Sequence, residues 1–439
     1  MSFFGPISPP LLNDASALVI RRAVQRARVV GNFATVQAAV QLISFASGIL
    51  VVRHLDQREY AYFTIANTMQ GTINVLADIG ISIALVSIGG RVWQDRQRFS
   101  ELISTALRLR RKLGAVVITV VAPILYFMLI RNGASVAYAL LLIAVIVGGL
   151  VVQLSAGVLS VVPRLRADIA KLQSIDLVGA VIRLVLLAAV VSVFLNAGVA
   201  VATGSAALLL QYWILHRYTV AVVDLKAPEN PEDRAAMRGF IKSQAANAIF
   251  FCLQGQITIF LISFFGSHAG AVAEVGALGR LAMIFAVLSH LLANVFAPAF
   301  ARCQSARKLR WQYAAIVGSV AVFSVVLLAT AALFPHAFLF VLGPKYLHLE
   351  RELVWMVGGA VASALAATLW ALNAAKAWIA GSWLYIPVTL ATQVALIPFI
   401  DFGNVRDVLI FNLFSALPSL VLNMVLSYRG FHSLRLSAA

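Results

Sequence analysis

Long hydrophobic segments separated by short polar connections run through almost the whole sequence. A helix of about 20 mostly apolar residues is needed to cross the roughly 30 Å hydrocarbon core of a bilayer. About twelve segments meet this requirement, at residues 31–52, 60–89, 113–131, 135–160, 174–195, 198–216, 240–265, 271–299, 312–334, 352–375, 378–400 and 405–427. The pattern therefore predicts an all-α, polytopic membrane protein.

One polar stretch divides these segments into two groups of six. Residues 224–238 contain two prolines and follow the sixth segment, as is typical of a linker. The predicted organisation has five parts: a basic N-terminal segment (1–30), an N-terminal six-helix lobe (31–222), a cytoplasmic inter-lobe linker (223–239), a C-terminal six-helix lobe (240–428) and a cytoplasmic tail (429–439). The connection after the first segment (53–60) has a weak counterpart after the seventh (265–274), which favours a repeat of the two lobes.

The basic residues are distributed unevenly between alternate connections. Most of the 34 Lys and Arg residues lie in connections on the same side of the membrane as the N-terminus, and cytoplasmic connections are enriched in these residues. The first 30 residues include Arg21, Arg22, Arg26 and Arg28, alternating with apolar residues as in a helix on the membrane surface. We therefore expect both termini to be cytoplasmic and membrane lipids to be partners.

Composition excludes several other classes of protein. The chain is 61% hydrophobic and 12% charged, so its net charge of +17 belongs to membrane topology rather than to a basic domain that binds nucleic acid. Cys252 and Cys303 lack the spacing of a disulfide framework or metal site. No phosphate-binding glycine loop is found, so ATP hydrolysis is not supported. We expect no cofactor and no metal.

Two arginines lie inside hydrophobic segments. Arg280 falls near the middle of the eighth segment, with His290 and Asn294 close to the same helical face. An arginine at that depth costs about 2.5–3.5 kcal/mol and generally faces a bundle interior or a watery cavity. Guanidinium can bind two phosphate oxygens, so this face suits a phosphate, although a structural arginine is the alternative. Arg183 lies two turns beyond Asp176, where an ion pair and a contact with cargo are equally plausible interpretations.

Other polar residues form stripes along the predicted spans. Gln41 lies on such a stripe in the first span, Asn67 and Asn74 in the second, and Gln254 in the seventh. They could line a cavity for a polar cargo, or they could hydrogen-bond helices together in lipid. Lys376 follows the tenth span and has either a snorkelling or a cavity-facing position.

Asp78 is a candidate for ion coupling. It precedes Ile79 and Gly80 near the end of the second span, where it could simply terminate the helix. An intramembrane carboxylate could instead bind a proton or a sodium ion.

Two segments resemble a known family. Residues 52–66 (VRHLDQREYAYFTIA), followed by LADIGI at 76–81, resemble the first outer loop and second helix of polysaccharide flippases of the multidrug/oligosaccharidyl-lipid/polysaccharide (MOP) exporter superfamily. Residues 340–346 (FVLGPKY) and 352–356 (ELVWM) are similar to that family's Gly-x-x-Tyr entry to the tenth helix. The family commonly has a glycine in the turn occupied here by residues 54–57.

The resemblance implies two lobes around a central cavity that opens alternately to either side of a bacterial cytoplasmic (inner) membrane. The implied cargo is an oligosaccharide on polyprenyl pyrophosphate, moved to the outer leaflet for cell-surface or exopolysaccharide biosynthesis. Polysaccharide polymerase and glycosyltransferases would be partners. A polar path is physically required, because a glycan crossing hydrocarbon would lose its hydrogen bonds to water.

Three alternatives remain at this point. A lipid II flippase also carries a pyrophosphate cargo, and a cation-coupled multidrug exporter shares the architecture but would be expected to have a carboxylate-bearing cavity. A membrane oligosaccharide polymerase would need a long outer loop around an active site, and the predicted outer connections are all short. We therefore expect a transporter rather than an enzyme.

Overall fold

The computed structural model describes residues 35–166, 168–191, 195–265, 269–283, 296–303 and 305–436, together with 285, 289 and 292. All the regular elements in these ranges are helices, which confirms the predicted fold class. Ten helices are long and apolar enough to cross a membrane, and a bent pair forms an eleventh candidate. The chain is a multi-pass membrane protein. The predicted span at 271–299 falls partly outside the described residues.

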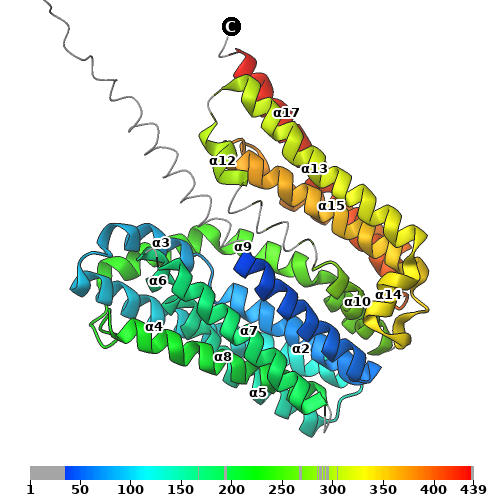
Figure 1. Ribbon diagram of the computed structural model, residues 1–439, viewed down its shortest axis with the longest axis horizontal. Coiled ribbons are helices and arrows are strands. Elements are labelled where there is room, and N and C mark those ends of the chain that lie inside the picture. The colour runs from blue at the N-terminus through cyan, green and yellow to red at the C-terminus, as the bar shows by residue number, and fades with distance from the viewer. Residues whose placement is uncertain are drawn as a thin grey trace, which may run out of the picture.

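The first half of the chain forms one bundle, which we call the N-lobe (Figure 1). Its helices are Thr35–His54, α2 (Gln57–Leu76), α3 (Ile81–Val92), α4 (Arg96–Arg131), α5 (Val136–Leu159), α6 (Val161–Leu165), α7 (Ile169–Val191) and α8 (Ala197–Val220). Polar side chains fix several of the helix starts. Asp95 accepts hydrogen bonds from the backbone N–H groups of Gln97 and Arg98, and Asn196 accepts one from Val199.

The second half begins with two helices that lie between the bundles, α9 (Pro231–Phe265) and α10 (Ala269–Leu281). A second bundle follows, which together with α9 and α10 we call the C-lobe (Figure 1). It contains α12 (Ala297–Arg302), α13 (Ala306–Leu333), α14 (Pro335–Leu342), α15 (Glu350–Ala375), α16 (Tyr385–Leu396) and α17 (Val405–Leu436).

The predicted second span is two helices rather than one. α2 and α3 meet at an angle of 43°. Gly80 lies at the bend with φ +70°, and a Cβ there would be 2.9 Å from the backbone of Phe240 in α9. Only glycine meets both demands easily, because it has no side chain and tolerates positive φ.

Two helices extend well beyond the hydrophobic segments that predicted them. α4 continues the span at 113–131 back to Arg96, and the apolar side chains of this extension, including Phe99, Leu102 and Ile103, are buried against α3, α6 and α9. The apolar side chains of the basic stretch at 91–112 therefore pack on protein. α9 likewise begins at Pro231, inside the predicted linker.

The start of α9 is held firmly on α4. Asp233 accepts two hydrogen bonds from the Arg98 guanidinium, at 2.6 and 2.9 Å, and its side chain is almost fully buried. Asn230 donates from its side chain to Glu101 and from its backbone to Thr105. Bidentate, charge-assisted bonds of this kind are strong, so this end of α9 moves with the N-lobe.

The two lobes meet at one end of the molecule through a set of contacts that we call the outer latch (Arg53, Gln57, Glu274, Lys345 and His348). Arg53 donates to the carbonyl oxygens of Phe340 and Val341 at the end of α14, at 2.6 and 3.0 Å. Lys345 donates to the carbonyl oxygen of Leu55 at 2.9 Å.

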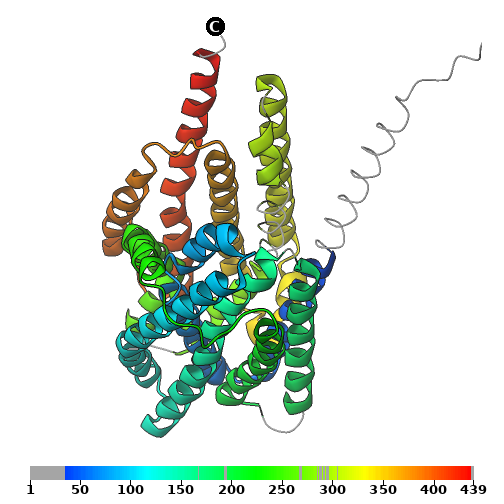
Figure 2. The same ribbon diagram turned by 90° about the vertical axis from the view of Figure 1, so that its left-hand side faces the viewer.

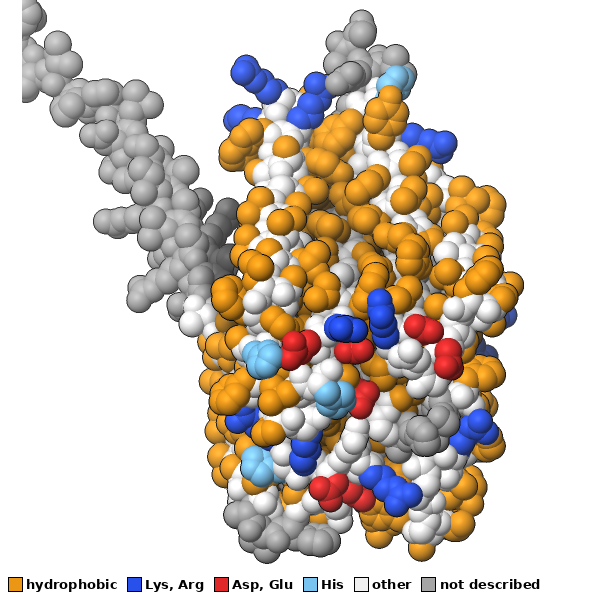
Figure 3. Space-filling model, turned by 90° about the vertical axis from the view of Figure 1, so that its right-hand side faces the viewer, with side chains coloured by type: hydrophobic (Ala, Val, Ile, Leu, Met, Phe, Trp, Pro, Cys, Tyr) orange, Lys and Arg blue, Asp and Glu red, His pale blue; other side chains and the backbone are white. Residues whose placement is uncertain are grey.

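Glu274 completes the latch. It accepts a hydrogen bond from Gln57 at 3.1 Å and contacts His348 at 3.1 Å. Figure 3 shows this end of the molecule, where acidic, basic and histidine side chains gather across an otherwise largely hydrophobic surface. At the opposite end, α13 and α17 lean away from the N-lobe (Figures 1 and 2). The lobes are thus joined at the predicted outer side and separate toward the predicted cytoplasmic side.

Candidate functional site

The N-lobe encloses a cavity of about 400 Å³. Its walls come from the first helix, α2, α5, α7 and α8, so it lies among the helices that the sequence places in one six-span unit. The lining includes one arginine, one carboxylate, four amides and several glycines or small residues: Arg183, Asp176, Asn67, Gln70, Gln153, Gln211, Gly71, Gly179, Gly204, Ser44 and Ser205. We call this space the N-lobe cavity.

Arg183 projects into the N-lobe cavity from the middle of α7. Its side chain passes close to Gly204 of α8, where a Cβ would be 3.9 Å from the arginine Nε. Nε is buried without a hydrogen-bond partner. Asp176 lines the same cavity, but no ion pair joins the two among the described residues. The structure therefore does not support the interpretation of Arg183 and Asp176 as an ion pair.

Arg280 lies at the edge of the same space, at the end of α10. Its Nε donates to the Tyr60 hydroxyl at 3.4 Å, and its guanidinium lies 5.7 Å from the ring centre of Phe63, which lines the N-lobe cavity. Gly48 of the first helix makes room for it, since a Cβ there would be 3.4 Å from the arginine Cδ. Arg183 lines the same cavity as Phe63, so the two arginines border one space. Neither arginine is bonded to a carboxylate among the described residues.

The remaining predicted binding residues are spread over different places. Asn67 lines the N-lobe cavity. His290 and Asn294 lie outside the described residues. The hydrogen bond between Gln70 and Gln153, at 3.0 Å, was not foreseen from the sequence, although Gln70 follows Asn67 by three residues and so lies on the same helical face.

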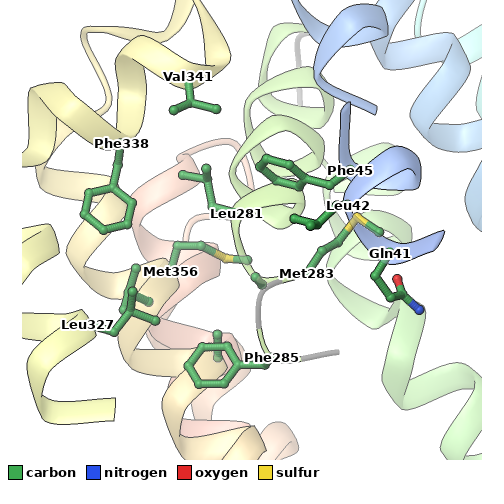
Figure 4. Close-up of a pocket in the computed structure, with 13 residues that line it drawn as sticks. Gln41, Leu42, Phe45, Leu281, Met283, Phe285, Leu327, Phe338, Val341 and Met356 are labelled. Atoms are coloured by element: carbon green, nitrogen blue, oxygen red, sulfur yellow. The ribbon is translucent and has the colours of Figure 1, made fainter. Parts of the chain in front are cut away.

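Gln41 faces a different space. It borders a largely apolar pocket of about 290 Å³ between the first helix and the C-lobe, beside Leu42, Phe45 and Met283. Figure 4 shows the apolar side chains converging from both sides of this pocket, with Gln41 at its margin. The first helix therefore borders two spaces, because Ser44 of the same helix lines the N-lobe cavity.

Asn74 and Asp78 form a cluster with a buried arginine of α4. Asp78 makes an ion pair with Arg110 at 3.1 Å and accepts a hydrogen bond from Ser82 at 2.8 Å. The same arginine donates to Asn74 at 3.4 Å, and it is only 4% exposed. The carboxylate is thus already neutralised by a partner in this state. Its proposed role in ion coupling stays a prediction, and it would require this pair to open.

Gln254 and Lys376 make contacts within the C-lobe. Gln254 exchanges two side-chain hydrogen bonds with Gln393 of α16, at 2.9 and 2.7 Å. Lys376 donates to the carbonyl oxygens of Ala301 and Cys303 at the end of α12, at 3.0 and 2.7 Å. These bonds hold helices together, and a role in binding cargo stays a prediction for both residues. No group of three or more His, Cys, Asp or Glu side chains that could hold a metal is found in the described ranges.

The arrangement of helices matches solved transporters. The lipid II flippase MurJ in an inward closed conformation aligns with a TM-score of 0.66 and 9% identity, covering 92% of each chain. An inward-facing multidrug resistance MATE family transporter of the MOP superfamily aligns with a TM-score of 0.62 and 15% identity, covering 92% of this chain and 100% of that one. The chain has the fold of MOP superfamily transporters.

A third solved structure extends this fold match. A MOP superfamily transporter from Pyrococcus furiosus Vc1, described as having a binding pocket of reverse polarity that suggests a different function, aligns with a TM-score of 0.56 and 16% identity. That alignment covers 90% of this chain and 93% of that one. No family model matches the sequence, and no curated protein matches it either.

Proposed function

We propose that this protein is a flippase that moves a polyprenyl-pyrophosphate-linked oligosaccharide from the inner to the outer leaflet by alternating access. The observation that carries the proposal is the pair Arg183 and Arg280. Arg183 lies in a helix that is long and apolar enough to cross a membrane, and Arg280 lies in the predicted eighth span. Both border the space lined by Phe63, and neither is bonded to a carboxylate among the described residues.

Such a pair favours an anionic cargo. Each arginine costs about 2.5–3.5 kcal/mol to insert at mid-membrane, and mutual repulsion adds to that cost. A pyrophosphate would offset it, because its oxygens can accept bidentate hydrogen bonds from both guanidinium groups. The buried Nε of Arg183, which has no hydrogen-bond partner among the described residues, could donate to a phosphate oxygen.

The surroundings suit the attached glycan. The amide side chains of the N-lobe cavity can exchange hydrogen bonds with hydroxyl groups that would otherwise be stripped of water. The outer latch closes the predicted outer side while the lobes part on the other, so the cavity would load from the inner leaflet. The fold of the protein and the two resembling segments agree with this cargo class.

One observation favours a second candidate. Asp176 lines the N-lobe cavity without an ion-pair partner among the described residues, and a carboxylate of this kind would suit a cationic drug. A multidrug exporter predicts that Asp176→Asn abolishes transport and that loss of either arginine is tolerated. The flippase predicts that loss of either arginine abolishes transport and that Asp176→Asn is tolerated.

The deciding experiment uses a strain whose surface polysaccharide depends on this gene. We expect Arg280→Ala and Arg183→Ala to reduce surface polysaccharide at least about tenfold at unchanged membrane abundance, the effect of about 1.4 kcal/mol. Arg→Lys at either position should restore only part of it, because lysine keeps the charge without the planar fork. Arg217, which stacks on Trp213 at 3.9 Å, provides a matched Arg→Ala control. Normal polysaccharide in both arginine variants would contradict the proposal.

A further inference from the structure

The C-lobe contains a second cavity, of about 380 Å³. It lies among α9, α15, α16 and α17, and in the predicted orientation these lining residues occupy the cytoplasmic half of the membrane. We call it the C-lobe cavity. Its lining combines four aromatic rings with small polar and amide side chains: Phe251, Trp370, Trp383, Tyr385, Asn247, Asn423, Ser363, Ser382 and Ser419.

The two cavities occupy corresponding places in the two lobes. In each six-span unit the first, fourth, fifth and sixth spans contribute to the walls, and they are the first helix, α5, α7 and α8 in one lobe and α9, α15, α16 and α17 in the other. The second span, α2, also lines the N-lobe cavity. Their chemistry differs. The N-lobe cavity contains Arg183 and Asp176, whereas the described lining of the C-lobe cavity contains no charged side chain and is rich in aromatic rings.

Helix α9 places the two cavities close to one another. Gly71, in the wall of the N-lobe cavity, lies beside Gln256 of α9, since a Cβ on Gly71 would be 3.9 Å from the amide nitrogen. Asn247 and Phe251, one turn apart on the same helix, line the C-lobe cavity. A single elongated cargo could therefore contact both cavities across α9.

Two polar side chains of the C-lobe cavity lack partners among the described residues, whereas Asn423 donates to the carbonyl oxygen of Ser419. Asn247 and Ser363 are exposed and make no side-chain hydrogen bond with any described residue. An amide and a hydroxyl group without partners can hydrogen-bond a polar occupant but not a lipid chain, so they favour a polar occupant of this cavity.

The aromatic side chains supply flat surfaces beside those groups. Tyr385 stacks on Phe251 with ring centres 5.3 Å apart, and the Trp370 ring is 42% exposed. An apolar wall with a few convergent hydrogen-bonding groups is the usual composition of a small-molecule site. A sugar ring matches it, because its C–H face is apolar and its rim carries hydroxyl groups.

We propose that the C-lobe cavity binds a sugar ring of the cargo while Arg183 and Arg280 hold the phosphates. This inference rests on the proposed flippase function and divides the cargo between the lobes. Trp370 provides the stacking surface, and the side-chain amide of Asn247 donates hydrogen bonds to hydroxyl oxygens and accepts them from hydroxyl groups.

The test measures binding of two separate probes to the full chain in nanodiscs. One probe is inorganic pyrophosphate, and the other is the repeat-unit oligosaccharide released by mild acid from the surface polysaccharide of the host. We expect Trp370→Ala and Asn247→Ala to raise the Kd of the oligosaccharide about tenfold and to leave pyrophosphate binding unchanged. Arg183→Ala should raise the Kd of pyrophosphate and leave oligosaccharide binding unchanged. Trp370→Phe should keep most of the oligosaccharide affinity, because it retains a ring.

Trp311, which is 73% exposed at the start of α13, provides the matched Trp→Ala control. Unaltered pyrophosphate binding in Trp370→Ala shows that the variant has folded. If the wild type binds pyrophosphate but not the oligosaccharide, or if oligosaccharide affinity survives in both Trp370→Ala and Asn247→Ala, the sugar subsite is wrong while the phosphate site stands. If Trp370→Ala and Asn247→Ala instead weaken binding of undecaprenol, measured as a third probe, this cavity is a lipid-chain site and the inference is overturned. Binding of neither probe to the wild type would instead contradict the flippase function.

Discussion

At the residue scale, the sequence revealed some of the charged groups inside the protein and hid others. Arg183 and Arg280 were visible from hydropathy alone, because an arginine within an apolar run is conspicuous. Arg110 was not, since it belongs to a basic stretch that reads as a cytoplasmic connection. The structure buries it against Asp78, 32 residues earlier in the chain. No local pattern could pair these two residues, because their contact depends on how α2 packs against α4.

The pair of Arg110 and Asp78 yields a stability prediction. Arg110→Ala would leave the Asp78 carboxylate without its partner, and we expect a loss of about 3 kcal/mol. This is the lower end of the usual range, because the Asp78 side chain is 32% exposed. The measurement is the thermal unfolding temperature in detergent.

Two further variants make that test specific. Replacing both partners, as in Arg110→Met with Asp78→Asn, should recover most of the loss because no unpaired charge remains. Lys112→Ala, two residues further along α4 and exposed, should have no effect on the unfolding temperature. If Arg110→Ala unfolds at the wild-type temperature, the pair is not a structural contact.

At the scale of elements, hydropathy located most helices but not their full extent. The amphipathic first halves of α4 and α9 carry too many polar residues to appear as spans, and they become helical by packing on each other through the pair of Arg98 and Asp233. The bend between α2 and α3 was also hidden. It depends on the close approach of Phe240 to Gly80, two segments that are distant in the sequence.

The outer latch is expected to stabilise the state in which the outer ends of the two lobes are joined. The double variant Arg53→Ala with Lys345→Ala removes its bonds to the end of α14 and to the carbonyl oxygen of Leu55. Exposed contacts of this kind contribute up to about 1 kcal/mol each, enough together to shift a two-state equilibrium about tenfold or more. We expect the outer ends of the lobes to separate in a larger fraction of molecules.

Spin labels at Asp56 and Arg351, both exposed and outside the latch, would report that separation as a longer inter-label distance. Arg131→Ala with Arg406→Ala removes two exposed arginines from the same predicted side and should leave the distances unchanged. An unaltered distance distribution in the latch variant would show that the latch does not set the balance.

At the scale of the whole molecule, the positive-inside pattern predicts which end faces the cytoplasm. It predicts that the outer latch lies outside and the start of α9 inside. With both native cysteines replaced by serine, Asp56→Cys should react with a membrane-impermeant maleimide in intact cells, and Glu232→Cys should react only after the membrane is permeabilised. The opposite pattern of labelling would reverse the orientation and with it the loading side of the cavities.

Helix α9 has a mechanical consequence for any rocking of the lobes. Its start is fixed to α4 by the ion pair between Asp233 and Arg98. The polar stretch before α9 therefore cannot act as a flexible linker between two independent lobes. Further along α9, Gln254 hydrogen-bonds to α16 and Phe251 stacks on it, so this part of α9 is fixed to the rest of the C-lobe. Because its two ends are fixed to different lobes, α9 would have to twist or bend when one lobe moves against the other. Rocking of the lobes would then change the shape of both cavities together, because each cavity lies against α9.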